Sequence, residues 1–206
     1  MSTDHDVQRV ETLLASVPVP GSTLARLHRR LEGAAAAAGA LDVAYTTLET
    51  PVGTLLLAAT EQGLVRVAYD REDHEKVLTD LADRLGPRIL HAPARLEPAV
   101  EQLREYFAGA RTRFDLPLDR ALSRGFRRLV QEHLPGIDYG STRSYGAVAR
   151  EVGRPRAVRA VGTACATNPL PVVVPCHRVL RGDGGLGGYI GGPEAKSALL
   201  ELEAAA

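Results

Sequence analysis

The sequence has few cysteines and no long apolar run. Only Cys165 and Cys176 occur among its 206 residues, too few for a disulfide framework or for a cysteine-based structural zinc site. No stretch of about 18 apolar residues is long enough to span a membrane, and the amino-terminal residues carry acids and arginine where a signal peptide is apolar. We therefore expect a soluble, cytoplasmic protein without a metal site, in which any special cysteine acts as a nucleophile.

The net charge is zero, but the charges are unevenly distributed. Residues 121–206 contain 11 Lys and Arg against 7 Asp and Glu, which leaves 14 against 18 upstream. Most of the basic excess lies between Arg124 and Arg159. Such a patch can neutralise phosphates, although scattered surface arginines more commonly serve solubility. On its own, the patch leaves nucleic-acid binding open.

Hydrophobic periodicity divides the chain into three parts. Apolar residues recur at helical spacing in residues 7–14 and again in 24–31, which predicts that residues 1–41 are a helical extension packed on the domain behind it. The pattern then predicts an antiparallel meander of three strands, at residues 43–49, 54–60 and 64–70. Helical patterns follow at 73–85 and 96–107, with a strand-like segment at 111–118. We interpret residues 42–120 as a small α+β domain.

Residues 121–206 are expected to be mainly helical, with helices at 126–134, 145–152, 155–166 and 193–203. Ala149 stands four positions before Gly153, which indicates either a helix-turn-helix or an ordinary pair of antiparallel helices. The helix at 155–166 is rich in small side chains, so its backbone can approach another surface closely. That surface is either protein core or a DNA groove into which Arg159 projects.

Cys176 is the strongest candidate for chemistry. The apolar run Val172–Val174 predicts a short buried β-like segment that ends at Pro175 and presents the cysteine beside His177 and Arg178. A free thiol titrates near 8.5, so a cysteine nucleophile needs help to ionise, and an adjacent imidazole and guanidinium can supply it. We therefore favour a reactive cysteine over a structural one.

A glycine-rich loop follows, at residues 184–192, around Tyr189. Its backbone can come close to a ligand. Gly182, Gly184 and Gly187 fit G-x-G-x-x-G, but no βαβ unit surrounds them, so neither a bound nucleotide nor a bound methyl donor is expected, and no cofactor is assigned. If the last helix folds back, Glu203 can orient His177 as the third member of a Cys/His/acid relay.

Three segments of residues 126–203 carry a family resemblance: YGSTRSYGAVAREVGRPRAVRAVGTACATNPLPVVVPCHRV, GGLGGYIGG and KSALLELE. In them the chain resembles the O6-alkylguanine-DNA alkyltransferase family, and the PCHRV motif in this setting is highly specific. The stretch TPVGTLLLAATEQGLVRVAY resembles that family's amino-terminal domain more loosely. The resemblance implies an RNase H-like α/β domain followed by a helical domain of the winged-helix, helix-turn-helix type.

The resemblance also implies the chemistry. Cys176 would accept an alkyl group from O6-alkylguanine in duplex DNA, irreversibly and once per molecule, with O4-alkylthymine as a further candidate substrate. His177 would deprotonate the thiol through a bound water, and Glu203 would orient His177. Asn168 would brace the turn between the recognition helix and the cysteine segment. The protein would act as a monomer, with cooperative assembly on DNA left open.

For DNA, the resemblance implies a recognition helix in the minor groove and a flipped nucleotide. Arg159 would fill the space that the nucleotide leaves, and Tyr145 would rotate the nucleotide and hydrogen-bond the base. The groove-facing residues would be Arg156, Ala157, Ala160 and Gly162. The base pocket would be formed by Val179, Tyr189 and Ile190, together with the carbonyl of Cys176.

The chain departs from the family pattern in places. It has no tryptophan and carries Gln131 near a position where relatives often have one, and Ile190 replaces a small polar residue of some relatives. The cysteine ligands of the zinc site of some relatives are absent. Two other functions stay open: a damage-binding protein that recognises alkylguanine without accepting the group, and a cysteine hydrolase or transferase acting on a small molecule.

Overall fold

The computed structural model describes residues 20–205, and the chain divides into two compact units between Ala40 and Leu41. In the first unit, helix α2 (Gly21–Ala37) covers the apolar pattern predicted at 24–31. Its residues Leu24, Leu27 and Leu31 are each about half exposed. The helical pattern at 7–14 lies outside the described residues. In the described part, no helix is long and apolar enough to cross a membrane.

The second unit begins with a four-stranded sheet in the order β3-β2-β1-β4. As predicted, β1 (Val43–Leu48), β2 (Leu55–Thr60) and β3 (Gly63–Tyr69) form an antiparallel meander. The fourth strand, β4 (Ile89–His91), pairs parallel to β1 and was not predicted. Three residues are too few to show the alternation of a strand.

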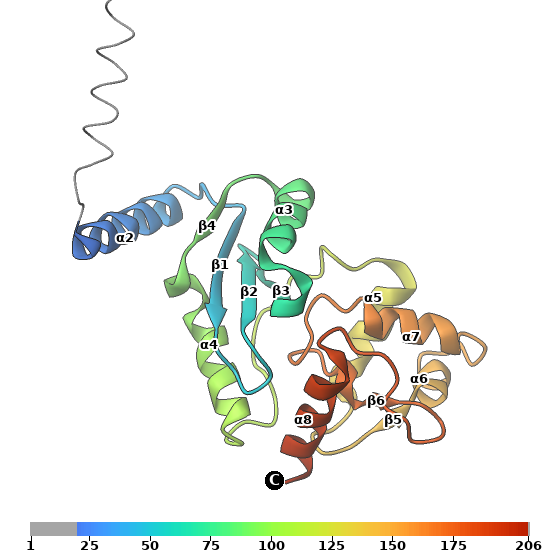
Figure 1. The fold of residues 1–206 in the computed structure, drawn as a ribbon. Helices are drawn as coiled ribbons and strands as arrows, with labels where there is room; N and C mark the ends of the chain where they lie inside the picture. The colour runs from blue at the N-terminus through green and yellow to red at the C-terminus, as the bar shows by residue number, and fades with distance from the viewer. Residues whose placement is uncertain (1–19, 206) are drawn as a thin grey trace, which may run out of the picture. The chain divides into compact units, whose positions relative to one another are not determined.

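Two helices cover opposite faces of this sheet (Figure 1). Helix α3 (His74–Leu85) buries Val77 against Leu56 on one face. Helix α4 (Pro93–Phe107) buries Leu103 against the other face, which carries Leu57. All positions of β2 are therefore buried, because neighbouring side chains point to opposite, equally covered faces.

The predicted strand at residues 111–118 is wrong. The segment forms one isolated bridge, between Leu64 and Leu118. The amide of Leu64 donates to the carbonyl of Pro117 at 2.9 Å, and the amide of Asp119 donates to the carbonyl of Leu64 at 2.9 Å. Pro117 lacks an amide hydrogen, so it cannot donate to a ladder, and the apolar residues pack along β3 without a strand of their own.

Residues 121–205, called the helical domain, follow residues 41–120, called the sheet domain. Its helices are α5 (Gly125–His133), α6 (Tyr145–Glu151), α7 (Val158–Ala166) and α8 (Gly192–Ala204). Two short parallel strands, β5 (Arg143–Ser144) and β6 (Val179–Leu180), precede α6 and follow the cysteine segment. The chain therefore has the predicted α+β class, and the larger hydrophobic core is continuous between its two domains.

The turn between α6 and α7 is a helix-turn-helix turn. Gly153 adopts a φ of +72°, a left-handed conformation that glycine tolerates. The amide of Gly153 donates to Arg150 at 2.9 Å, and the amide of Arg154 donates to Ala149 at 2.8 Å, so the last carbonyls of α6 are satisfied. Helix α7 begins three residues later than predicted, since residues 155–156 form a turn.

Candidate active site

Cys176 opens a single 3-10 turn, Cys176–Arg178, directly after Pro175. The residue is 1% exposed, so its sulfur is closed to solvent. Its Sγ accepts a hydrogen bond from Nδ2 of Asn168 at 3.2 Å. A donor at this distance stabilises a thiolate more than a thiol. The amide of Asn168 is therefore a direct partner of the sulfur as well as a brace for the chain.

The segment before the cysteine is a buried turn, and the prediction of a β-like run at Val172–Val174 is wrong. Asn168 holds this turn: its Nδ2 donates to the carbonyl of Val174 at 2.8 Å, and its Oδ1 accepts from the amide of Leu170 at 3.1 Å. Val172 has a φ of +70°, which is strained for a β-branched residue. The valines are buried as predicted, but prolines on both sides prevent a paired strand.

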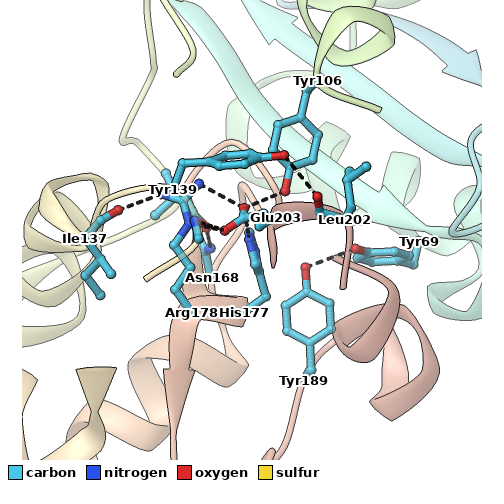
Figure 2. Close-up of polar contacts among 12 residues, drawn as sticks. Tyr69, Tyr106, Ile137, Tyr139, Asn168, His177, Arg178, Tyr189, Leu202 and Glu203 are labelled. Carbon is cyan, nitrogen blue, oxygen red and sulfur yellow. Dashed lines mark hydrogen bonds and ion pairs between the residues drawn. The ribbon is translucent and has the colours of Figure 1, made fainter. Parts of the chain in front are cut away.

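His177 and Glu203 form a buried pair (Figure 2). Nε2 of His177 lies 2.8 Å from Oε1 of Glu203, and the two residues are 0% and 3% exposed. Because a carboxylate only accepts, this contact places the proton of the imidazole on Nε2. Nδ1 of His177 is buried and has no hydrogen-bond partner among the described residues, so it is the ring atom free to take a proton.

Glu203 is the centre of this network. Besides His177, its Oε1 accepts from the hydroxyl of Tyr106 at 2.7 Å and from Nη2 of Arg178 at 2.9 Å. Its Oε2 accepts from Nε of Arg178 at 2.9 Å and from the amide of Gly140 at 3.2 Å. Burial alone would raise the pKa of Glu203, but the donors from His177, Arg178 and Tyr106 hold it at about 2. The residue is therefore a carboxylate at neutral pH.

The structure corrects the expected role of Arg178. Its guanidinium binds Glu203 and, through Nη1, the carbonyl of Ile137 at 2.6 Å. The expectation that this guanidinium and the imidazole make the resting thiol acidic is wrong: burial raises the pKa of Cys176 to about 11, against the opposing effects of Asn168 and Lys196. Burial also lowers the pKa of His177, so the imidazole is a neutral base and not a cation.

Lys196 is a buried residue that the sequence analysis missed. It is 0% exposed, and its Nζ donates to the carbonyl of Val179 at 2.6 Å and to that of Leu186. The ammonium thereby ties the glycine-rich loop to β6. The spacing of Lys196, Leu199 and Glu203 places all three on one helical face, a signal that was available in the sequence.

Of the two predicted tyrosines of the base pocket, Tyr145 lies against the glycine-rich loop and Tyr189 belongs to it. Tyr145 is the first residue of α6, and a Cβ built at Gly187 would come within 2.7 Å of its hydroxyl, so only glycine fits there. Burial raises the pKa of Tyr145 to about 12. Tyr189 lies edge-on to the ring of His177 at 6.3 Å, and its hydroxyl hydrogen-bonds that of Tyr69 at 3.0 Å.

The other two predicted pocket residues, Val179 and Ile190, lie in β6 and beside an interdomain cavity. Val179 is in β6, where its carbonyl already accepts from Lys196. Ile190 lines a cavity between the two domains together with Asn168, Arg66 and Arg84. The structure thus brings Cys176, His177, Glu203 and Asn168 into one buried cluster, with Tyr189 against it.

Helix α7 and the turn before it present the residues predicted to face DNA. Arg156, Arg159 and Ala160 are exposed, and Ala157 and Gly162 are partly exposed. Its opposite face is buried through Val161, Ala164 and Cys165. Gln131 of α5 fixes the end of this helix, since its buried amide donates to the carbonyl of Ala164 at 2.9 Å. Cys165 is thus a core residue, and burial raises its pKa.

The fold and the site define a class of two-domain protein, in which a buried cysteine of a helix-turn-helix domain lies beside a histidine–carboxylate pair. The chain belongs to the 6-O-methylguanine DNA methyltransferase family. Residues 43–120 match the model of that family's ribonuclease-like domain, and residues 125–205 match the model of its DNA binding domain.

Relatives and solved structures agree with this membership. The methylated-DNA–protein-cysteine methyltransferase of Mycolicibacterium paratuberculosis is 42% identical over 161 residues, which cover 78% of this chain and 92% of the relative. The constitutive enzyme of that name from Bacillus subtilis is 41% identical, over 77% and 94%. The crystal structure of Mycobacterium tuberculosis O6-methylguanine methyltransferase matches with a TM-score of 0.69 and 41% identity, over 79% and 93%. A structure of the Mycobacterium tuberculosis protein OGT in complex with DNA matches with a TM-score of 0.66 and 39% identity, also over 79% and 93%.

Proposed function

We propose that the protein repairs O6-alkylguanine, above all O6-methylguanine, in duplex DNA by transferring the alkyl group irreversibly to Cys176. The observation that carries this proposal is the buried cluster of Cys176, Asn168, His177 and Glu203 in a chain of this family. Relatives at 41–42% identity are named as methylated-DNA–protein-cysteine methyltransferases. O4-alkylthymine is a second candidate substrate.

The transfer is a displacement at the alkyl carbon. The sulfur of Cys176 forms the new C–S bond as the bond between that carbon and O6 of guanine breaks. The thiol proton passes through a water to Nδ1 of His177, the ring atom without a protein partner. The imidazolium that forms is stabilised by the carboxylate of Glu203. The thioether product is stable to water, so one molecule repairs one lesion.

The leaving base also needs a proton. Tyr145 donates its hydroxyl hydrogen to N3 of guanine, so that the base leaves as a neutral species. Its raised pKa keeps the hydroxyl protonated until the charge develops on the base. The carbonyls of Cys176 and Val179 accept from the exocyclic amine, and the amide of Ile190 donates to O6. The carbonyl of Val179 has one lone pair left for this contact, since Lys196 occupies the other.

DNA binds through the exposed face of α7, inserted into the minor groove. The small residues Ala157, Ala160 and Gly162 let the backbone approach closely, and Arg156 contacts phosphate. Arg159 fills the space of the flipped nucleotide, because unstacking the base costs a few kcal/mol that new contacts must offset. The protein binds as a monomer, and neighbouring molecules can assemble cooperatively.

The test is the intact mass of the protein after incubation with a duplex that contains O6-methylguanine, with Cys176→Ser as the matched variant. We expect the wild type to gain one CH₂, mapped to Cys176 by peptide analysis and saturating at one per molecule. The variant should bind the duplex and keep its mass. Methylation at another residue, or repeated turnover, would contradict the proposal.

One observation favours a second candidate, a damage-binding protein without transfer. Cys176 is closed to solvent, and burial raises its pKa to about 11, so the resting thiol is a poor nucleophile. The same incubation separates the two functions. Tight binding of the lesion duplex without any mass gain supports the damage-binding protein.

A further inference from the structure

Tyr106 brings a hydroxyl group from the sheet domain into the carboxylate network of the helical domain. It lies near the end of α4 and is 0% exposed. Its ring packs against Phe107, Phe114 and Tyr139, with ring centroids 5.4, 5.3 and 6.0 Å away. The tyrosine therefore has a fixed orientation, and its hydroxyl is the polar end of a tightly held aromatic side chain.

The hydroxyl of Tyr106 and the imidazole of His177 share one acceptor atom. Oε1 of Glu203 accepts from Tyr106 at 2.7 Å and from Nε2 of His177 at 2.8 Å (Figure 2). Nη2 of Arg178 donates to the same oxygen at 2.9 Å. Each further donor on Oε1 draws its negative charge away from the imidazole. Among the hydrogen bonds of the described residues, the one from Tyr106 joins the sheet domain to Glu203.

We infer that Tyr106 is a positioning residue that acts through Glu203 on His177, fixing the position of Oε1 and limiting the basicity of the imidazole. The inference deepens the proposed alkyl transfer and rests on it for its kinetic consequence. Tyr106 itself stays protonated, because burial and the negative charge of Glu203 raise its pKa. It thus remains a hydrogen-bond donor at neutral pH.

The charged and titratable groups around His177 and Glu203 together set the pKa of the imidazole. His177 faces Glu203 and Lys196 of α8, and Arg178 and Cys176 of its own turn. The ring of Tyr189, from the loop, lies edge-on to it. Glu203 faces Arg178, Tyr106, Tyr139 and the amide of Gly140. Removing the hydroxyl of Tyr106 leaves the charges of Arg178 and Lys196 in place. The substitution therefore changes only the set of donors to Oε1 of Glu203.

The test compares Tyr106→Phe with Tyr139→Phe in the full chain. Tyr139 packs edge-on against Tyr106, but its hydroxyl donates to the carbonyl of Leu202 at 3.4 Å and not to Glu203. Two readouts are used: the pH dependence of single-turnover methyl transfer from an O6-methylguanine duplex, and the NMR chemical shift of the proton on Nε2 of His177 in the free protein.

For Tyr106→Phe we expect the rising limb of the pH–rate profile to move to higher pH by about half a unit. Oε1 of Glu203 then has one hydrogen-bond donor fewer and keeps more negative charge, which raises the pKa of His177. The Nε2 proton should move downfield as its hydrogen bond to Glu203 shortens. Tyr139→Phe should change neither readout. The profile and the proton shift together distinguish positioning from packing.

A lower melting temperature of Tyr106→Phe with an unchanged profile and proton shift would overturn the inference, since the tyrosine would then serve only packing. Equal shifts in both variants would overturn it as well. The NMR readout does not require transfer. If the wild type failed to accept a methyl group, the proposed function would fail while the effect of Tyr106 on His177 would still be decided.

Discussion

Glu203 shows how one buried carboxylate holds a site together. It accepts five hydrogen bonds, from His177, Arg178 twice, Tyr106 and the amide of Gly140. A buried charge is tolerated only when it is paired in this way, and removing one partner leaves the other uncompensated. The side chain therefore stabilises the fold and orients the imidazole at the same time.

We expect Glu203→Gln to reduce the free energy of unfolding at pH 7 by about 3–5 kcal/mol, because the guanidinium of Arg178 loses its counter-charge. Chemical unfolding at pH 7 measures this loss. Glu201→Gln, at an exposed position of the same helix, is the control and should stay within about 0.5 kcal/mol of the wild type. An equal loss in both variants would contradict the prediction.

The loss of stability in Glu203→Gln should depend on pH, in a direction set by the pKa of Glu203. The pKa of Glu203 is about 2 in the folded protein, against an ordinary value of 4.5. Its contribution to stability is therefore complete above about pH 4.5 and is lost as the pH falls towards 2. The difference in free energy of unfolding between wild type and Glu203→Gln should therefore shrink as the pH falls from about 4.5 towards 2. A difference that is constant from pH 7 to pH 3 would show that the charge of Glu203 is not responsible.

The residues of the site differ in how far the sequence could reveal them. Cys176 and His177 are adjacent in a distinctive motif, so local chemistry and resemblance both pointed to them. Tyr106 lies 97 positions from Glu203 along the chain, and no local pattern links the two. Lys196 is of a residue type that is ordinarily exposed, so its burial was not predicted from the sequence. The low basicity of His177 and the high pKa of the thiol follow from burial, which a sequence does not show.

At the scale of elements, helix α7 combines a buried face with an exposed face of small residues. Gly162 is partly exposed, and a Cβ at that position would meet no atom within 4 Å. We expect Gly162→Ala to stabilise the fold by about 0.5–1 kcal/mol, since alanine is the better helix former. The same methyl group should weaken duplex binding by about tenfold, or about 1.4 kcal/mol, because it separates the helix from the groove.

Thermal unfolding and fluorescence anisotropy with a labelled duplex measure these two opposite effects. Gly33→Ala is the matched control, since Gly33 also lies in a helix with open space at its Cβ. It should leave duplex binding unchanged. Unchanged binding by Gly162→Ala would mean that this face of α7 does not contact DNA.

Regular elements were predicted well where they are long and periodic, and poorly where tertiary contacts decide. The meander and the helices α3, α4 and α5 follow their hydrophobic patterns. The apolar run before Cys176 is equally compatible with a strand or a buried turn, and the hydrogen bonds of Asn168 select the turn. Strand β4 exists only because β1 offers it an edge.

At the scale of the whole molecule, the chain consists of a small unit, residues 1–40, and a much larger one, residues 41–206. Residues 41–206 form one compact unit, and both family matches lie within it. We expect deletion of residues 1–40 to leave the main thermal transition and the rate of methyl transfer unchanged, because no residue of the site lies in that part. Calorimetry and the mass assay check this, with the full chain as control. A slower transfer by the shortened protein would assign the extension a part in repair.

The buried network also has a consequence for how the protein is made. Tyr106 is translated long before Glu203, which completes the network from the last helix. A ribosome-bound chain therefore carries the cysteine, the histidine and the arginine before the carboxylate that neutralises and orients them. The acceptor site is therefore complete only once α8 has folded back and Glu203 has bound His177 and Arg178.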